Sequence, residues 1–331
     1  MILVTGGTGL VGAHLLLNLA ENEDAVRAIY RTSASIEKTK SLFSLYQKET
    51  LFSKIDWVEA DITDVPSLEI AFQNIDYVYH CAGFISFDPN DEEKLRKINI
   101  EGTANIVNFC LANNIKKLCH VSSIAAFGNV TSSEIFIDEE TEWNPEINHS
   151  DYAISKYGAE MEVWRGQQEG LQVVVVNPGI ILGSTIWKKG SGSIFVKIKK
   201  GLRFYTLGES GYVGVKDVVS IMIQLMKRDI IGERFCLVSE NVSYRNVINL
   251  IAEKTNKPKA RFHAKPWMTA ILWRIDWFLN TFFRTKRILS KHSATSIHSI
   301  DKYNNFKIKN ALNFEFQSID NVIKEIISSK K

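Results

Sequence analysis

The sequence has 331 residues, enough to bury a large core, and it suits either one extended α/β unit or a larger domain with a smaller lobe. Its 40 lysines and arginines and 37 acids leave a formal net charge of +3, which argues against nucleic acid as a partner. The four cysteines have neither CxxC nor Cys/His metal spacing: Cys81, Cys110, Cys119 and Cys236. We therefore expect a reduced, cytoplasmic protein with no metal site.

The amino terminus joins a short apolar run to a glycine-rich turn. Met1 to Val4 have the pattern of a buried strand, so we expect no signal peptide, and an apolar helical pattern follows residues 5–12. In a strand–turn–helix unit, Gly6 permits the tight turn, Gly9 lets the backbone approach a pyrophosphate, and Gly12 lets helix and strand pack closely. The N–H groups at the helix start attract the anion. We predict dinucleotide binding by residues of this turn: Gly6, Thr8, Gly9, Leu10, Val11 and Gly12.

Strand-like and helical patterns alternate along the first half of the chain. Short apolar runs predict strands at Ile2–Val4, Val26–Tyr30, Trp57–Ala60, Tyr77–Cys81, Leu118–Val121 and Val173–Val176. The segments between them have helical periodicity: Leu10–Glu21, Ile36–Thr50, Val65–Gln73, Glu92–Asn113 and Tyr152–Glu169. Apolar strands separated by helices predict an α/β fold of the Rossmann type, a doubly wound parallel sheet covered on both faces.

The pattern becomes less regular after Asn177, where residues 179–214 are rich in glycine. Further on we expect a strand that returns to the sheet and three helices: Arg234–Val238, then Tyr244–Asn256, Trp267–Phe283 and Ile319–Ile327. We expect residues 1–178, with 215–238, to form a dinucleotide-binding domain, and residues 179–214 and 239–331 to form a smaller substrate-binding lobe. The substrate would bind in the cleft between them.

The end of the second strand bears on the choice of dinucleotide. An acid there binds the ribose 2′-hydroxyl of NAD, whereas an arginine accommodates the 2′-phosphate of NADP. Here the strand ends in Arg31-Thr32-Ser33 without an acid, so we favour NADP(H) over NAD(H); the alternative is an arginine that only faces solvent. Asp61-Ile62, after the third strand, fits a contact to the adenine edge, although Asp61 could equally cap the helix that follows.

A tyrosine and a lysine four residues apart suggest a catalytic pair. Tyr152 and Lys156 share one helix face, so both side chains can point into one cleft. A lysine cation favours the phenolate and moves the pKa of a tyrosine toward neutral pH, as a proton donor to a carbonyl needs. Ser122 and Ser123 end the fifth predicted strand, and ligands bind at the carboxyl ends of parallel strands. This position favours a catalytic pair over an ordinary surface pair.

Together these motifs resemble those of the extended short-chain dehydrogenase/reductase family, within the NAD-dependent epimerase/dehydratase superfamily, over nearly the whole chain. Three further segments match the family: His80-Cys81-Ala82-Gly83, Ile98-Asn99-Ile100-Glu101-Gly102-Thr103 and Asn177-Pro178-Gly179. The resemblance implies an NAD(P)-dependent oxidoreductase whose cofactor also contacts Cys81, Ala82, Gly83, Tyr152, Lys156 and Pro178.

The resemblance also implies a role for each member of the catalytic set. Tyr152 would be the general acid/base, and Lys156 would bind the nicotinamide ribose and lower the pKa of the tyrosine. Ser123 would hydrogen-bond the substrate oxygen, because the family's serine stands five residues before a glycine, here Gly128. Asn99 would hold a water that links the lysine to solvent, the alternative being an asparagine bonded to its own backbone. A non-catalytic nucleotide sensor would have little reason to keep these four residues together.

Within the family, the sequence resembles the dihydroflavonol reductase branch. Ile124 and Ala125 stand where family dehydratases have an acid pair, and the arginines common in nucleotide-sugar epimerases are missing from residues 174–176 and 209–210. We expect an apolar cleft lined by Phe84, Ile85, Phe87, Phe127, Ile180 and Ile181, with plain core as the alternative. We therefore predict NADP(H)-dependent reduction of a ketone or aldehyde on a small, partly apolar substrate. An NAD(H)-dependent epimerase or sterol-type dehydrogenase/isomerase is the alternative.

The stretch from Lys257 to His292 is unusually aromatic and basic. Its rings and central charges are Trp267, Trp273, Trp277, Phe278, Phe282, Phe283, Arg274, Asp276, Arg284, Lys286 and Arg287. Charges near the middle argue against a membrane-spanning helix. We favour a helix that covers the substrate cleft or packs on a dimer partner over peripheral membrane contact through residues 267–287. A homodimer through the helices holding Asn99 and Tyr152 is implied by the resemblance alone.

Overall fold

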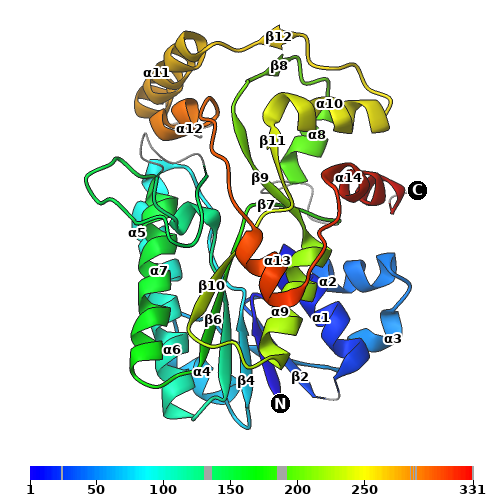
Figure 1. Cartoon of the computed structure of the whole chain (residues 1–331), viewed down its shortest axis with the longest axis vertical. Helices are drawn as coiled ribbons and strands as arrows, with labels where there is room; N and C mark the ends of the chain where they lie inside the picture. The colour runs from blue at the N-terminus through cyan, green and yellow to red at the C-terminus, as the bar shows by residue number, and fades with distance from the viewer. Residues whose placement is uncertain are drawn as a thin grey trace.

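The apolar runs of the first half of the chain form one sheet of parallel strands (Figure 1). In the computed structural model, which describes residues 1–329 except 24, 130–135, 185–191, 284, 286 and 288, the strand order is β10-β6-β5-β4-β1-β2-β3. The strands are β1 (Ile2–Thr5), β2 (Val26–Tyr30), β3 (Ile55–Glu59), β4 (Tyr77–His80), β5 (Lys117–Val121), β6 (Val173–Pro178) and β10 (Glu233–Leu237). All neighbouring strands are parallel, which confirms the predicted Rossmann-type sheet.

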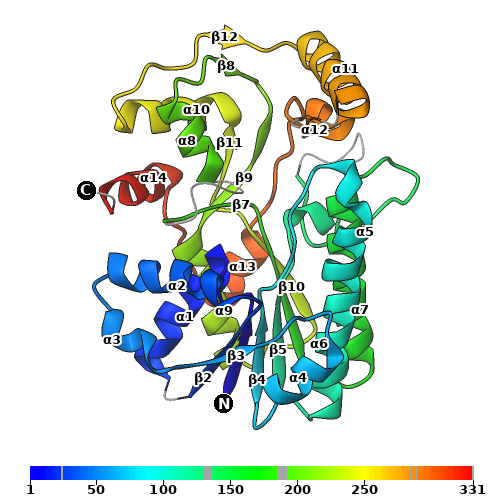
Figure 2. The same cartoon turned by 180° about the vertical axis from the view of Figure 1, so that it is seen from behind.

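Helices cover both faces of the sheet (Figures 1 and 2). On one face lie α1 (Leu10–Asn22), α2 (Ser33–Leu45), α3 (Glu49–Phe52), α9 (Val215–Lys227) and α13 (Phe306–Leu312). On the other lie α4 (Val65–Ala71), α5 (Glu92–Leu95), α6 (Gly102–Ala112) and α7 (Asp151–Gln168). Val174 and Val176 belong to the first core, whereas Val173 and Val175 belong to the second. Because both faces are buried, the strand is apolar at every position instead of alternating.

Two predicted helices are interrupted. Residues 92–113 follow the short turn η1 (Pro89–Asp91) and form α5, then a π-helical turn, η2 (Arg96–Glu101), and then α6. Hydrophobic periodicity does not distinguish such a turn from an α-helix, because it lasts little more than one turn. The predicted helix at residues 36–50 is divided between α2 and α3, since Gln47 has a left-handed φ of 55° that ends the first helix.

A second group of elements lies beyond the carboxyl ends of the strands (Figure 2). β6 runs directly into β7 (Ile180–Leu182), which pairs with β9 (Glu209–Gly214); β9 in turn pairs with β11 (Glu240–Ser243). Three helices pack around a third apolar core: α8 (Ser193–Lys199), α10 (Tyr244–Lys254) and α14 (Ile319–Ser328). The division into a dinucleotide domain and a substrate lobe stays a prediction.

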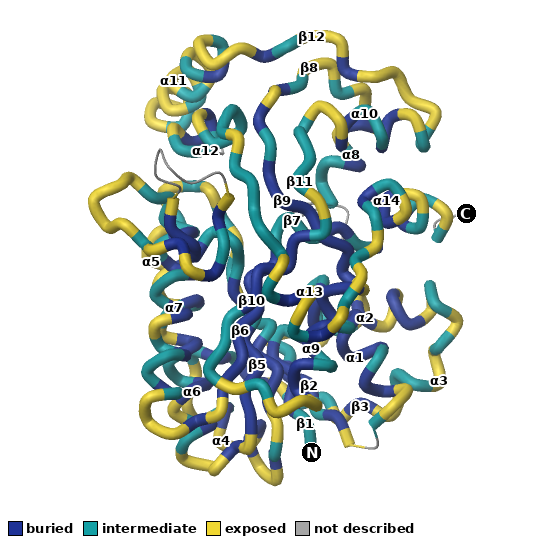
Figure 3. Tube along the Cα trace, viewed as in Figure 1, coloured by how far each residue is buried: buried dark blue, intermediate teal, exposed yellow. Residues whose placement is uncertain are grey.

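The remaining elements form the far end of this second group. β8 (Phe204–Tyr205) pairs with β12 (Phe262–His263), which leads into α11 (Pro266–Phe283) and then α12 (Lys291–Ser296). α11 packs mainly on α12, and most of its length is exposed in Figure 3. Arg284 and Lys286 of the basic stretch lie outside the described residues. Of the helices that the structure describes, none is long and apolar enough to cross a membrane.

Candidate active site

The glycine turn between β1 and α1 is closed by contacts that exclude side chains. Gly6 has a left-handed φ of 67°, and its carbonyl oxygen accepts a 2.9 Å hydrogen bond from the N–H of Gly9. A Cβ on Gly12 would lie only 2.3 Å from that same oxygen. Gly9 is the N-cap of α1, where no described side chain caps the helix, so the N–H groups of its first turn remain available to an anion. These residues fit the pyrophosphate of a dinucleotide.

The other predicted cofactor residues border this turn. Thr8 and Leu10 are half-buried within it, and Val11 is buried beneath it. The segment after β4 lies against the turn, because a Cβ on Gly6 would stand 2.6 Å from the backbone nitrogen of Ala82. The structure therefore brings the turn together with the predicted second segment, which is Cys81, Ala82 and Gly83.

The residues expected around the adenosine have different local roles. Arg31 is exposed at the end of β2, directly before α2. The Asp61 carboxylate accepts from the backbone N–H and the hydroxyl of Thr63, at 2.9 and 2.8 Å, so it stabilises the turn before α4 instead of capping that helix. The side chain of Ile62 is buried against Gly102. Contact of these residues with an adenosine stays a prediction.

Three predicted catalytic side chains meet at the carboxyl edge of the sheet. Ser123 follows β5 and caps the short turn η3 (Ile124–Ala126), while Tyr152 and Lys156 lie in the first turns of α7. The Ser123 side chain lies near enough to the Tyr152 hydroxyl to lower the pKa of that phenol. Nζ of Lys156 donates a 2.8 Å hydrogen bond to the carbonyl oxygen of Val121, the last residue of β5. Pro178, another predicted cofactor contact, is buried at the end of β6.

Burial dominates the protonation of these groups. It raises the pKa of Tyr152, and the neighbouring Ser123 side chain offsets part of that rise. It lowers the pKa of Lys156 to about 8, against the opposing effect of the Glu160 carboxylate. We expected the lysine to lower the pKa of the tyrosine, but the largest effect on the phenol is its removal from water. A phenol that stays protonated at neutral pH can act as a proton donor.

Asn99 joins the segment after β4 to α7. It is buried in the π-helical turn, its Oδ1 accepts from the N–H of Phe84 at 2.7 Å, and its Nδ2 donates to the carbonyl oxygen of Phe84 at 2.9 Å. The same Nδ2 donates to Oγ of Ser155 at 2.9 Å. The side chain is therefore not bonded to its own backbone, which was the alternative. A π-helical turn is often found at functional sites, and the proposed water relay stays a prediction.

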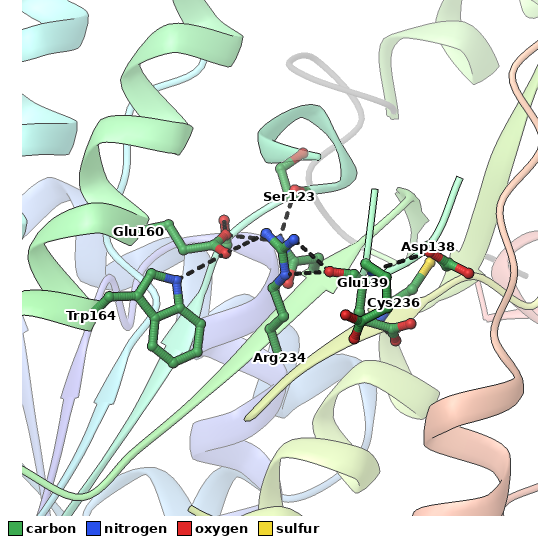
Figure 4. A network of polar contacts seen from close by, with 10 residues as sticks. Ser123, Asp138, Glu139, Glu160, Trp164, Arg234 and Cys236 are labelled. Atoms are coloured by element: carbon green, nitrogen blue, oxygen red, sulfur yellow. Dashed lines mark hydrogen bonds and ion pairs between the residues drawn. The ribbon is translucent and has the colours of Figure 1, made fainter. Parts of the chain in front are cut away.

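A buried carboxylate lies one turn beyond Lys156 and was not predicted from the sequence. Glu160 is fully buried, and its carboxylate accepts from Oγ of Ser122 at 2.7 Å and from Nδ2 of Asn177 at 2.9 Å. It also pairs with Nη1 of Arg234 at 3.1 Å (Figure 4). Ser122 directly follows β5, Asn177 lies near the end of β6 and Arg234 lies near the start of β10, so one side chain of α7 is held by three adjacent strands. The sequence did contain a signal for this residue. Tyr152, Lys156 and Glu160 follow one another at intervals of four residues, so they share one face of the helix.

The arginine of this network reaches a second carboxyl residue. Nε of Arg234 donates to the carbonyl oxygen of Glu139 at 3.0 Å, and the Glu139 carboxylate accepts a 2.6 Å hydrogen bond from the N–H of Cys236 (Figure 4). Burial raises the pKa of Glu139. This contact fixes the loop after β5 to the edge strand β10.

The residues expected to line an apolar cleft divide into two groups. The ring of Phe87 lies 5.6 Å from the ring of Tyr152 and is 55% exposed, so an apolar surface adjoins the tyrosine. Phe127 instead belongs to a small core cluster with Val238, and the guanidinium of Arg234 covers its ring. For Phe127 the expectation of a cleft position was wrong, because the carboxyl-edge network closes over it. The others are half-buried or exposed: Phe84, Ile85, Ile180 and Ile181.

Comparisons with known proteins identify the family to which the sequence is similar. The model of the NAD dependent epimerase/dehydratase family matches residues 2–235. The chain is 29% identical over 271 residues to a putative dihydroflavonol 4-reductase of Synechocystis sp., which covers 80% of this chain and 75% of the relative. It is 26% identical over 266 residues to sterol demethylase protein B of Methylococcus capsulatus, covering 80% of this chain and 77% of the relative.

Solved structures share the fold at low sequence identity. The UDP-glucose 4-epimerase of Thermotoga maritima with UDP-glucose has a TM-score of 0.79 and 21% identity, covering 99% of this chain and 98% of that one. The dTDP-glucose 4,6-dehydratase of Streptomyces venezuelae, with NAD bound, has a TM-score of 0.75 and 16% identity, covering 99% and 96%.

The Glu160 network makes a prediction about stability. Glu160→Gln removes the charge that compensates Arg234 inside the protein, so we expect the free energy of unfolding to fall by about 3 kcal/mol. Glu162→Gln is the matched control on the same helix. It removes a half-buried ion pair with Arg165 and should lower the free energy of unfolding by less than about 1 kcal/mol. Urea unfolding of both variants measures the difference. Equal effects would show that the buried carboxylate has no special structural role.

Proposed function

Because the chain belongs to the NAD dependent epimerase/dehydratase family, we propose that it is an NADP(H)-dependent reductase of a ketone or aldehyde on a small, partly apolar substrate. Family membership establishes an NAD(P)-dependent enzyme of the extended short-chain dehydrogenase/reductase type acting on small molecules. The reaction, the coenzyme preference and the substrate are the parts that we propose.

The meeting of the Ser123 and Tyr152 side chains at the carboxyl edge of the sheet is the observation that carries the proposal. A substrate carbonyl oxygen at these two hydroxyls would accept hydrogen bonds from both, and the Tyr152 hydroxyl would transfer its proton as negative charge develops on that oxygen. The Ser123 hydroxyl would hold the same oxygen in place. Lys156, with a pKa near 8, is largely cationic at neutral pH and stabilises the phenolate left after proton transfer. When bound, the nicotinamide supplies the hydride.

The proposed coenzyme site follows from the glycine turn and its neighbours. The turn would hold the pyrophosphate, the segment Cys81 to Gly83 and Pro178 would border the nicotinamide half, and Arg31 would bind a 2′-phosphate. An exposed guanidinium at a strand end can approach a phosphate in a bidentate manner. Nothing acidic occupies residues 31–33, where an NAD-specific site would place its carboxylate.

The substrate class is proposed from the wall beside the tyrosine. Phe87 presents an exposed ring next to Tyr152, which favours an apolar or aromatic group near the reacting carbonyl. Several relatives at 24 to 29% identity are named reductases of flavonoid-type compounds. The similarity to sterol demethylase protein B favours a sterol-type dehydrogenase as the second candidate.

The first test removes the proposed proton donor. Tyr152→Phe should lower kcat at least about 100-fold, because the carbonyl oxygen loses its acid, while NADPH still binds. The activity is measured with the best carbonyl found by screening aromatic and aliphatic ketones and aldehydes for NADPH oxidation. Tyr157→Phe is the control on the same helix: its ring stacks on Trp143, with centroids 4.4 Å apart, so the variant should keep its activity. Full turnover by Tyr152→Phe would refute the proposed chemistry.

The second test concerns the coenzyme. Arg31→Ala should weaken NADPH binding about 10- to 100-fold, because it removes a charge-assisted contact to the 2′-phosphate. It should leave NADH binding unchanged, because NADH lacks that phosphate. Isothermal titration with each coenzyme gives both constants from one variant, so NADH acts as the internal control. An equal loss for both coenzymes, or no loss for either, would contradict the role of Arg31.

A further inference from the structure

Helix α11 turns an apolar side toward solvent, whereas an ordinary surface helix turns its apolar side toward the core. Five large side chains at helical spacing point away from the protein and are 49 to 65% exposed: Trp267, Ile271, Ile275, Phe278 and Phe282. These positions form one stripe along the helix, because their spacings are four, four, three and four residues. Leu272, Leu279 and Phe283 widen the same apolar face and are 40 to 67% exposed.

Two polar side chains of α11 are turned toward the protein. Oγ1 of Thr269, the one buried residue of the helix, donates to the carbonyl oxygen of Ala294 at 3.1 Å and lies 2.9 Å from Nε2 of His298. Oδ2 of Asp276 accepts from the N–H of Leu289 at 3.1 Å. These contacts fix the rotation of α11 about its axis, so the apolar stripe is held outward, in contact with solvent.

The sequence around the stripe is rich in basic residues. From Lys257 to His292 the sequence has nine lysines and arginines and one acid, Asp276, which faces Arg287 at 3.8 Å. The adjoining residues 192–208 add four basic residues and no acid. The two segments are neighbours, because β12 pairs with β8 (Figure 1). Phe204 and Phe262, 48 and 55% exposed on these strands, extend the apolar surface.

We propose that α11, with the adjoining β8–β12 ribbon, docks on the surface of an anionic lipid bilayer. Aromatic and aliphatic side chains of the stripe would enter the boundary between headgroups and acyl chains, and the surrounding cations would lie at the level of the lipid phosphates. No helix among the described residues is suited to span a membrane, so the contact is peripheral. A second copy of the chain fits less well, because two such faces would bring like charges together.

The test is flotation of the full-length protein with vesicles. Vesicles of phosphatidylcholine with about 30 mol% phosphatidylglycerol should bind the protein at least about tenfold more strongly than pure phosphatidylcholine, and high salt should weaken that binding. The double variant I275E/F282E should lose at least about tenfold of the binding, because it places carboxylates in the stripe. The control V65E/I70E changes two apolar side chains of α4 that are 46 and 57% exposed, and it should bind like the original protein.

Circular dichroism and coenzyme binding establish that both double variants are folded, since neither pair of residues belongs to the proposed active site. The proposal is overturned if the protein binds neither kind of vesicle, if it binds both equally, or if I275E/F282E floats as well as the original. It is also overturned if sedimentation equilibrium without lipid shows a dimer that I275E/F282E converts to a monomer while vesicles have no effect. That outcome would assign the stripe to a second copy of the chain.

Discussion

The buried carboxylate of Glu160 is the contact on which the geometry of the site depends. A charge removed from water is costly unless every partner is in place, and here the partners come from β5, β6 and β10. The network therefore fixes the position of α7 along the sheet. Ser122, one of its donors, is the neighbour of Ser123, and Tyr152 lies two turns before Glu160 on the same helix. One interaction thus aligns Ser123 with Tyr152.

Features encoded over short distances in the sequence could be predicted. The strands were predictable because both faces of the sheet are buried, which makes runs such as Val173 to Val176 apolar at every position. The glycine turn was predictable because its backbone conformation excludes side chains at Gly6 and Gly12. The meeting of Ser123 with Tyr152 and Lys156 followed from two rules: parallel strands end at one edge, and residues four apart share a helix face.

Features that depend on distant partners could not be predicted. Arg234 is 74 residues from Glu160, and no local pattern links them. The π-helical turn that buries Asn99 is too short for hydrophobic periodicity to distinguish it from the α-helices beside it. The rotation of α11 is decided by Thr269 and its contacts with α12, so the sequence showed an aromatic, basic helix but not which face it presents. The preference for a cleft cover or packing helix therefore rested on composition alone.

The fate of the hydride tests the account most directly. NADPH carrying deuterium at the transferable C4 position would be incubated with the enzyme and a ketone that it reduces, and the alcohol analysed by mass spectrometry and NMR. The account predicts one deuterium at the former carbonyl carbon, with NADP+ released in equal amount. The account would be contradicted if deuterium never reached a product, if NAD+ stayed tightly bound, and if a substrate turned over without net oxidation or reduction. That result would identify an epimerase instead.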